Sequence, residues 1–421
     1  NIAWKVACGL ALDDPGFHPS VLSLWRARLR ASDRPERIFE VVRQIVHATG
    51  VLKGKTRRAL DSTLLDDAVA TQDTVTQLVA AIRRVRRLVP AAAALQLDAH
   101  DYNQPGKPAC AWDDQAAREQ LVSGLVGDAL AVLGALVDAE LDATQAEAVG
   151  LLGVVAGQDV EPGERLGSWR IARKVAPDRV ISVVDPDSRH MHKSRRSYRD
   201  GYKAHLAAEP ETGLVTQAKL TPANAGDGPT GLQLLSDEPD GLEVLADSAY
   251  GGGETRAGLR AAGHLQTVKP LALRSAVPGG FTKDDFRIDL DQQSVTCPAG
   301  HTVGITPSSQ AVFGQRCSGC PLRARCTTAK DGKTLRVHPH EAELLAARRR
   351  ASAPEFIASY RQWRPMVERS IAWLVAGGNR RVPYRGLARN QQWLSLRVAA
   401  INLRRLVTMG LNHHSAGWML A

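Results

Sequence analysis

The hydrophobic positions of this chain follow different periods in different segments. Short runs in which apolar residues dominate or alternate with polar ones predict β-strands at residues 51–66 and again between about Val180 and Val268. In residues 74–157, and again from Glu341 to about Met409, apolar residues recur every three or four positions, which predicts amphipathic helices. We therefore expect an α/β protein with a mixed sheet whose strands are separated by helical sequence.

Individual strands can be predicted within the second strand-forming region. RVISVVDPDSR (179–189) is strand-like, and GYKAHLAAE with LVTQAKLT, joined by the turn PETG, predicts an antiparallel hairpin. LEVLADSAYG, GETRAGLRAAG and HLQTVKP then predict a strand, a helix and a strand. Residues 271–340, which carry Pro, Gly, Asp and Cys, have the composition of an inserted module.

These patterns divide the chain into seven segments. They are a helical N-terminal domain (1–50), the first strand of a core (51–73), an all-helical insertion (74–169), the continued core (170–270), a Cys-rich insertion (271–340), C-terminal helices (341–411) and a tail (412–421).

Length and hydropathy limit the class of protein. A chain of 421 residues predicts two or three domains, and 44% hydrophobic residues suffice for a folded core. No run of eighteen uncharged apolar residues occurs, which predicts no membrane span and a cytoplasmic location. The chain begins with Asn1 inside a helical pattern and shows no signal peptide, so we expect the N-terminal domain to be truncated.

The positive charge of the chain is concentrated near its C-terminus. Residues 321–421 contain 18 Lys and Arg against 5 Asp and Glu, whereas the whole chain has a net charge of +10. This region is rich in Arg and contains Trp363, Trp373, Tyr384 and Trp393. Arginine and aromatic side chains suit phosphates and stacked bases, so we expect a nucleic-acid-binding face; a solvated basic surface is the alternative.

Four of the six cysteines form a cluster in the sequence. Nineteen residues separate Cys297, the first residue of CPAGH, from Cys317, the first residue of CSGCPLRARC. Cys297, Cys317, Cys320 and Cys326 therefore lie within thirty residues. In a reducing compartment such a cluster indicates a metal site before a disulfide. We expect a structural Zn²⁺ site with His301 as a substitute ligand; an iron–sulfur cluster or unligated thiols are the alternatives.

Three acidic residues are candidates for a second metal site. Asp61 lies within a predicted strand, Asp247 ends another, and Glu368 lies on a predicted helix. A strand interior disfavours Asp, and a buried carboxylate is costly unless a cation meets it. Two Asp and one Glu at the end of a mixed sheet would suit Mg²⁺, which prefers oxygen ligands. The alternatives are a turn residue for Asp247 and a helix-surface ion pair for Glu368.

Asp185 is the rival to Asp61 as the first acid, because RVISVVDPD is also strand-like. We prefer Asp61, since Asp185 precedes a proline, where a turn is the ordinary explanation.

Several short motifs together give the chain a resemblance to a known family. The first strand carries Asp61-Ser62-Thr63, the later one Ala246-Asp247-Ser248-Ala249-Tyr250-Gly251, and Arg364 precedes Glu368 by four residues. Between them stand Asp185-Pro186-Asp187-Ser188-Arg189 and Gly201-Tyr202-Lys203. In this order the motifs resemble those of insertion-sequence transposases of the DDE type, and the resemblance covers nearly the whole chain. Two positions depart from the family pattern: Tyr360 lies one residue too far from Arg364, and Val375 stands where a Lys is expected.

The resemblance implies a fold and a function. The fold is a ribonuclease-H-like catalytic core, preceded by a helical domain for DNA binding or dimerisation. Asp61, Asp247 and Glu368 would be the catalytic acids and would bind Mg²⁺ or Mn²⁺. The reaction would be cleavage at insertion-sequence ends followed by strand transfer into target DNA, by a homodimer associated with the nucleoid. The phosphate contacts would come from Arg364, Arg369, Arg380, Arg381 and Arg385. A catalytically inactive DNA-binding relic, or a nuclease of the same fold without strand transfer, are the alternatives.

Overall fold

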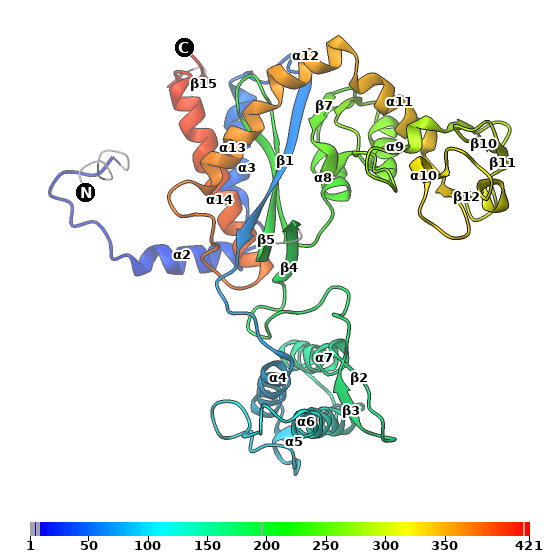
Figure 1. The fold of residues 1–421 in the computed structure, drawn as a ribbon. Helices are drawn as coiled ribbons and strands as arrows, with labels where there is room; N and C mark the ends of the chain where they lie inside the picture. Colours follow the sequence, from blue (N-terminus) through cyan, green and yellow to red (C-terminus); the bar gives the residue numbers. More distant parts are fainter. Residues whose placement is uncertain (1–4, 6–8, 195–196, 416) are drawn as a thin grey trace. The chain divides into compact units, whose positions relative to one another are not determined.

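The structure is a computed structural model that describes residue 5 and residues 9–194, 197–415 and 417–421. The chain divides into two compact units, each assembled from separate stretches of the chain. Figure 1 labels their helices and strands. The first unit contains residues 1–51, 65–202 and 380–421, and the second contains residues 52–64 and 203–379. Because all three predicted acids fall in residues 52–64 and 203–379, the second unit holds the candidate site.

A mixed sheet of six strands contains the predicted strand segments. Its order is β4-β5-β1-β7-β8, and β6 pairs with β5. The strands are β1 (Arg57–Asp66), β4 (Arg189–Ser194), β5 (Ser197–Ala208), β6 (Val215–Pro222), β7 (Glu243–Ala246) and β8 (Leu265–Val268). Strands β1, β7 and β8 are mutually parallel, whereas β4 runs antiparallel to β5. The sequence prediction of an α/β protein with a mixed sheet is thereby confirmed.

The strands of the second unit form where the apolar runs are fully buried. Val244, Leu245 and Ala246 of β7 have no exposed surface, which is typical of a parallel strand covered on both faces. Helices α8 (Asp227–Leu235) and α9 (Gly253–Ala261) contribute Leu234, Leu235 and Leu259 to the same core. At Gly231 a Cβ atom would lie 2.8 Å from the ring of Tyr250, so glycine allows α8 to approach this ring.

The predicted helical insertion consists of helices that pack on one another. They are α4 (Thr74–Leu88), α5 (Pro90–Ala93), α6 (Gln115–Ala135) and α7 (Ala143–Gln158), followed by the short strands β2 (Val160–Pro162) and β3 (Trp169–Ile171). Asp73, Asp114 and Asp142 cap the N-termini of α4, α6 and α7 by accepting backbone N–H groups. The predicted helices in this region are therefore present.

One predicted strand is wrong. RVISVVDPD has no strand before β4 begins at Arg189, and Asp185 lies in a turn. Val180 and Val183 instead join the hydrophobic core of the helical insertion. The backbone of Val180 is bonded by side-chain amides, from Gln77 Nε2 to its oxygen at 3.0 Å and from its nitrogen to Gln158 Oε1 at 2.9 Å. Because these amides satisfy the backbone, the segment needs no neighbouring strand.

The Cys-bearing region folds as two small sheets. One contains β9 (Arg287–Asp289), β10 (Ser294–Thr296) and β11 (Thr302–Gly304), and the other β12 (Gln310–Val312) and β13 (Thr334–Arg336). Two 3₁₀ turns, η2 (Lys283–Asp285) and η3 (Gly314–Cys317), and one short helix, α10 (Arg323–Cys326), complete it. Its core is formed by Phe286, Val295, Ala311, Phe313, Leu335 and neighbouring side chains.

The remaining helices lie near the two ends of the chain. The C-terminal ones are α11 (Glu341–Ala351), α12 (Pro354–Trp363), α13 (Pro365–Val375) and α14 (Leu387–Thr408), and the N-terminal ones are α2 (Ser20–Arg30) and α3 (Arg37–Ala48). Helix α14 packs on α3 within the first unit. Within the segment expected as a tail (412–421), β14 (Asn412–His414) pairs antiparallel with β15 (Gly417–Met419). Within the part of the chain described, every helix is too short or too polar to cross a bilayer.

Candidate active site

The first two predicted acids lie where two neighbouring parallel strands cease to pair. The register of β1 and β7 ends with Ala59 opposite Leu245. Asp61 lies two residues further along β1, and Asp247 directly follows β7, which ends at Ala246. Adjacent strands are spaced by about 4.8 Å. The two acids are close enough for the charge of Asp247 to raise the pKa of Asp61.

Asp61 has an unusual environment for a carboxylate. Its side chain is 16% exposed, and burial raises its pKa above the ordinary value. Arg364 and the backbone N–H of Ser62, which donates to Oδ1 at 2.9 Å, act in the opposite direction, whereas the charge of Asp247 raises the pKa further. Asp61 is thus a carboxylate whose ionised form needs a cation.

Asp247 lies directly after β7, where it caps a 3₁₀ turn, η1 (Ser248–Tyr250), and accepts the N–H of Ala249 at 2.9 Å. The alternative role as a turn residue is therefore present as well. The two roles are compatible, because Asp247 Oδ1 takes the hydrogen bond and leaves the other carboxylate oxygen for the site.

The third predicted acid is connected to the first by an arginine. Arg364 stands between helices α12 and α13, and its side chain is only 4% exposed. Its Nη2 lies 3.0 Å from Asp61 Oδ1, and its Nη1 lies 3.4 Å from Glu368 Oε1. Burial would lower the pKa of Arg364, but the neighbouring carboxylates, Asp61 first, raise it on balance. Glu368 itself is 62% exposed, so it forms the solvent side of this cluster.

The position of Arg364 depends on contacts that fix helix α12 against the sheet. Ser359 Oγ donates to Glu243 Oε1 at 2.6 Å, and the guanidinium of Arg57 lies 4.7 Å from the ring centroid of Trp363. Arg57 Nε also donates to Glu243 Oε2 at 2.9 Å. Strands β1 and β7 thereby anchor the end of α12 one residue before Arg364.

A buried polar network lies behind the first acid, and the sequence interpretation missed it. Ser62 Oγ donates to Asp227 Oδ1 at 2.6 Å, and Lys203 Nζ lies 3.3 Å from Asp227 Oδ2. His205 has no exposed surface and pairs through Nε2 with Thr221 Oγ1 at 2.9 Å. Burial lowers the pKa of His205 to about 4, so the ring is neutral at pH 7 and its 3.6 Å approach to Asp227 is not an ion pair there.

The spacing of Lys203 and His205 could have suggested part of this network, because residues two apart on a strand share a face. Asp227, which begins α8, gave no comparable pattern.

A second support fixes the segment after Asp247. Arg256 is 1% exposed and donates from Nε to the oxygen of Gly251 at 3.1 Å and from Nη2 to the oxygen of Val268 at 3.0 Å. Burial lowers its pKa to about 10. Arg256 therefore joins the turn after β7 to the end of β8.

The predicted alternative Asp185 is an anchor within the first unit. It is fully buried and accepts the hydroxyl of Tyr202 at 2.5 Å and the N–H of Gly386 at 3.1 Å. Burial raises its pKa, and the hydrogen bond from Tyr202 opposes this. These partners account for one of its carboxylate oxygens, while Oδ2 is buried without a hydrogen-bond partner among the described residues.

The predicted phosphate-binding arginines differ in exposure. Arg364 is buried against the acids, whereas Arg369, Arg381 and Arg385 are exposed and Arg380 is partly exposed. Arg369 belongs to the second unit, and Arg380, Arg381 and Arg385 belong to the first.

The donor set of the acid cluster suits a hard divalent cation, because it consists of carboxylate oxygens with an excess of negative charge. As the side chains stand, however, no three His, Cys, Asp or Glu among the described residues are arranged as a metal-binding set. The guanidinium of Arg364 is the cation that contacts Asp61 in this arrangement. The chemistry of the residues fits Mg²⁺, and their present geometry is that of an ion-pair cluster.

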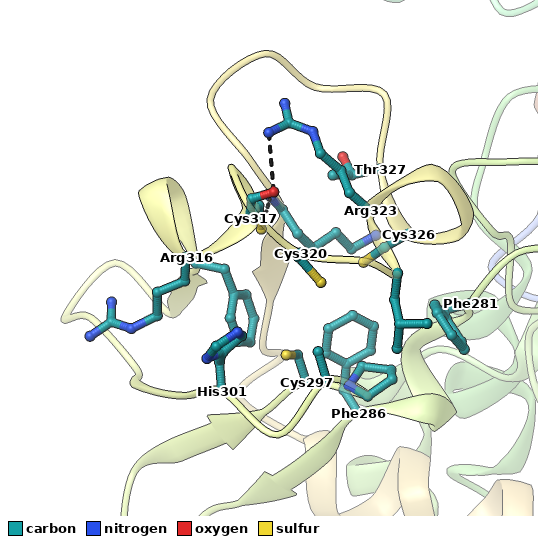
Figure 2. Close-up of a pocket in the computed structure, with 15 residues that line it drawn as sticks. Phe281, Phe286, Cys297, His301, Arg316, Cys317, Cys320, Arg323, Cys326 and Thr327 are labelled. Carbon is teal, nitrogen blue, oxygen red and sulfur yellow. Dashed lines mark hydrogen bonds between the residues drawn. The ribbon is translucent and has the colours of Figure 1, made fainter.

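The four predicted cysteine ligands line a single cavity, together with Phe281, Phe286, Phe313 and His301 (Figure 2). All four are free thiols. The structure therefore brings together residues that the sequence spreads over thirty positions.

Comparison with known proteins gives one family match. Residues 296–407 match the model of a family described as "Transposase DDE domain", which confirms the resemblance predicted from the motifs. The matched segment includes Arg364 and Glu368, while Asp61 and Asp247 lie outside it. A comparison with curated proteins finds no match.

Among solved structures, the chain is similar to the cryo-EM structure of a piggyBac transposase synaptic complex with hairpin DNA. The identity is 10%, the match covers 90% of this chain and 76% of the other, and the TM-score is 0.28. At this TM-score the likeness carries no argument about the present chain.

Proposed function

We propose that this chain, which carries a transposase DDE domain at residues 296–407, is a DNA transposase with a ribonuclease-H-like catalytic core. It cleaves DNA at the ends of an insertion sequence in the presence of Mg²⁺ or Mn²⁺ and joins the freed strands to target DNA. The observation that carries the proposal is the position of Asp61 and Asp247 at the end of the paired stretch of two adjacent parallel strands, with Arg364 connecting Asp61 to Glu368.

Asp61, Asp247 and Glu368 are the residues that would hold the divalent ions. When bound, such ions activate the attacking oxygen and stabilise charge on the leaving oxygen. The protein's own part is to keep the acids ionised and oriented. Arg364 favours the ionised form of Asp61 against burial and against the charge of Asp247. Ser62 and Asp227 hold the strand beside Asp61, and Arg256 holds the turn beside Asp247.

DNA is the proposed partner, as transposon ends and as target. Phosphate contacts position a nucleic acid without reading its sequence, and exposed arginines make them well. Arg369, Arg380, Arg381 and Arg385 are assigned this role, and Lys269, which follows β8 beside the Asp247 strand, is added to them. Arg364 is assigned to the acids rather than to DNA, because its guanidinium contacts Asp61 and Glu368. Two ends must be joined, so a homodimer on DNA is proposed, in the cytoplasm with the nucleoid.

The test uses DNA that flanks the reading frame in its genome, because an insertion sequence carries its ends there. Asp247→Asn removes one negative charge with little change in shape, so end cleavage should fall below detection while DNA binding is retained. Asp237→Asn is the matched control, since Asp237 is exposed in the same unit. Cleavage and joining are measured on gels and binding by fluorescence anisotropy.

The outcomes separate the alternatives. Full cleavage by Asp247→Asn would refute the assignment of this acid. Wild-type cleavage without joined products would indicate a nuclease, and DNA binding without any cleavage would indicate an inactive relic.

A further inference from the structure

The four clustered cysteines come from separate parts of the Cys-bearing region and converge on one space. Cys297 follows β10, Cys317 ends η3, Cys320 lies in the next turn and Cys326 ends α10. All four line a cavity of about 20 Å³, and Figure 2 shows their sulfur atoms around it. A shared cavity is the first requirement for a shared ligand.

The chemistry of the cavity wall selects the kind of ligand. Apart from the thiols and Thr327, its lining is apolar or basic. The aromatic members are Phe281, Phe286 and Phe313, and the cationic ones are Arg316, Arg323 and Lys333. Asp and Glu are absent from its lining, so oxygen-seeking ions such as Mg²⁺ or Ca²⁺ have no carboxylate there. Sulfur ligands favour soft or borderline metals. Four thiolates around a divalent ion carry a net charge of −2, which the basic side chains offset.

Hydrogen bonds from backbone N–H groups fix the turns that contain Cys297, Cys317 and Cys320. The N–H of Lys333 donates to Cys317 Sγ at 3.4 Å, an interaction that orients the sulfur. The N–H of Gly300 donates to the oxygen of Cys297 at 2.9 Å, and that of Cys320 to the oxygen of Cys317 at 3.4 Å. Gly300 has a φ of 85°, which the turn requires and glycine permits. The turns thus present each thiol from a fixed backbone position.

The cavity is large enough to admit a metal ion. One water-sized body needs roughly 10–15 Å³ of such volume, so a cavity of about 20 Å³ has room for a single ion. As the side chains stand, the described thiols do not form a metal-binding set, and closing them onto one ion requires rotation about their Cα–Cβ bonds.

We propose that Cys297, Cys317, Cys320 and Cys326 bind one Zn²⁺ ion tetrahedrally and that this ion holds the Cys-bearing region together. The region has five strands of only three residues each and a small core, and such a module commonly needs a metal or disulfides for stability. The four cysteines complete the tetrahedral set, so His301, which is exposed at the edge of the cavity, is not needed as a ligand. The proposal does not depend on the proposed function, because a structural ion is required whether or not the chain acts on DNA.

The ion has a defined consequence for the rest of the second unit. Lys283, at the start of the region, pairs with Glu341, which is fully buried at the first position of α11. Arg348 of the same helix pairs with Glu341 at 3.1 Å. If the region unfolds without metal, this buried carboxylate loses its first partner, and α11 should become more mobile.

The experiment measures metal in the full chain purified without added zinc. Elemental analysis should find one Zn²⁺ per chain, and a mercurial reagent that modifies thiols should release it to a colorimetric zinc indicator. Cys320→Ser should lose at least most of this zinc, whereas Cys110→Ser, a free cysteine of the first unit, should keep it. Replacing zinc with Co²⁺ should give the intense visible absorption of a tetrahedral thiolate site.

A second measurement uses the unmodified chain, so its result does not depend on whether the Cys320→Ser variant folds. In the unmodified chain the four thiols should resist a thiol reagent until a strong chelator is added, while Cys110 reacts at the same rate throughout. The proposal would be overturned by disulfides among the four cysteines or by iron in place of zinc. It would also be overturned if Cys320→Ser retained all of its zinc, or if the thiols reacted equally with and without chelator. None of these readouts involves DNA, so they succeed or fail independently of transposase activity.

Discussion

Replacing Arg364 with Met should destabilise the protein in a way that depends on pH. Arg364 is 4% exposed and lies 3.0 Å from Asp61, which is 16% exposed. Methionine has a similar length and adapts to irregular space, so the change removes the charge and largely retains the packing. Asp61 is then left beside Asp247 without its cation, and the free energy of unfolding at neutral pH should fall.

The size of the loss follows from the geometry. At an effective dielectric constant of about 20, unit charges about 4 Å apart interact by about 4 kcal/mol, which is an upper bound here. Removing one partner of a fully buried pair costs about 3–5 kcal/mol. Asp61 retains some exposure, and it can become neutral by binding a proton, which costs about 1.4 kcal/mol per unit of pKa shift. We therefore expect Arg364→Met to lower the free energy of unfolding by about 2–3 kcal/mol. Glu368 is 62% exposed, so its separate contribution is below about 0.5 kcal/mol.

The sign of the pH dependence follows from Asp61. Burial already holds its folded pKa above the ordinary value. A carboxyl group of this kind contributes most to stability when protonated, and the contribution is lost as the pH rises through the folded pKa. In Arg364→Met that pKa rises further, so the loss relative to the parent protein should be largest near neutral pH and should shrink towards about pH 5.

The assay is urea unfolding of the parent and the variant at about pH 5 and about pH 7.5, followed by circular dichroism. Arg369→Met, an exposed arginine on the same helix, is the control and should cost less than about 0.5 kcal/mol. Adding Asp61→Asn to Arg364→Met should recover part of the loss, because the uncompensated charge is gone. An equal loss at both pH values, or additive effects in the double variant, would refute the role assigned to Arg364.

Two further predictions concern the core and the buried histidine. Gly231→Ala places a Cβ 2.8 Å from the ring of Tyr250 and should lower the stability measured by thermal unfolding by about 1–3 kcal/mol. The control Gly150→Ala, in open space on α7, should be neutral or stabilising. Equal effects of the two substitutions would contradict the close packing of α8. His205 has a folded pKa of about 4 against an ordinary 6.5, so it contributes stability above about pH 6.5 that is lost as the pH falls towards 4. Replacing it with Gln should weaken the acid sensitivity of urea unfolding by up to about 3 kcal/mol, and an unchanged pH profile would show that His205 does not titrate in this way.

The secondary structure was largely predictable because periodicity reports local burial. The β7–α9–β8 unit and the β5–β6 hairpin were found from sequence, since each is built from consecutive segments. The pairing of β1 with β7 was not, because 186 positions separate their partners Arg57 and Glu243. No local pattern specifies a register over that distance.

The wrong strand at RVISVVDPD shows where apolar composition misleads. Val180, Ile181 and Val183 are buried as a strand would require. Their backbone, however, is bonded by Gln77, Gln158 and the main and side chains of Gln72. Three glutamines from other segments replace a neighbouring strand, and nothing in the segment's own residues could have indicated this.

The candidate site was only half predictable, for a related reason. The spacing of Arg364 and Glu368 suggests an ion pair on one helix face, which the structure contains. It does not reveal that Arg364 turns inward to Asp61. That orientation depends on a break before Pro365, on the contact of Trp363 with Arg57 and on the hydrogen bond from Ser359 to Glu243.

These contacts join α12 to both strands that carry the acids, so the charge balance of the site is a property of the assembled sheet and helix. The sequence predicts the three acids as a cluster of like charges, but it does not indicate which cation lies beside them. The structure adds the partner, a buried arginine that directly precedes the helix carrying the third acid. A divalent ion entering this cluster must therefore either share Asp61 with Arg364 or displace the guanidinium. The pH-dependent cost of Arg364→Met measures how strongly that arginine is held, which sets the energetic threshold for any cation to replace it.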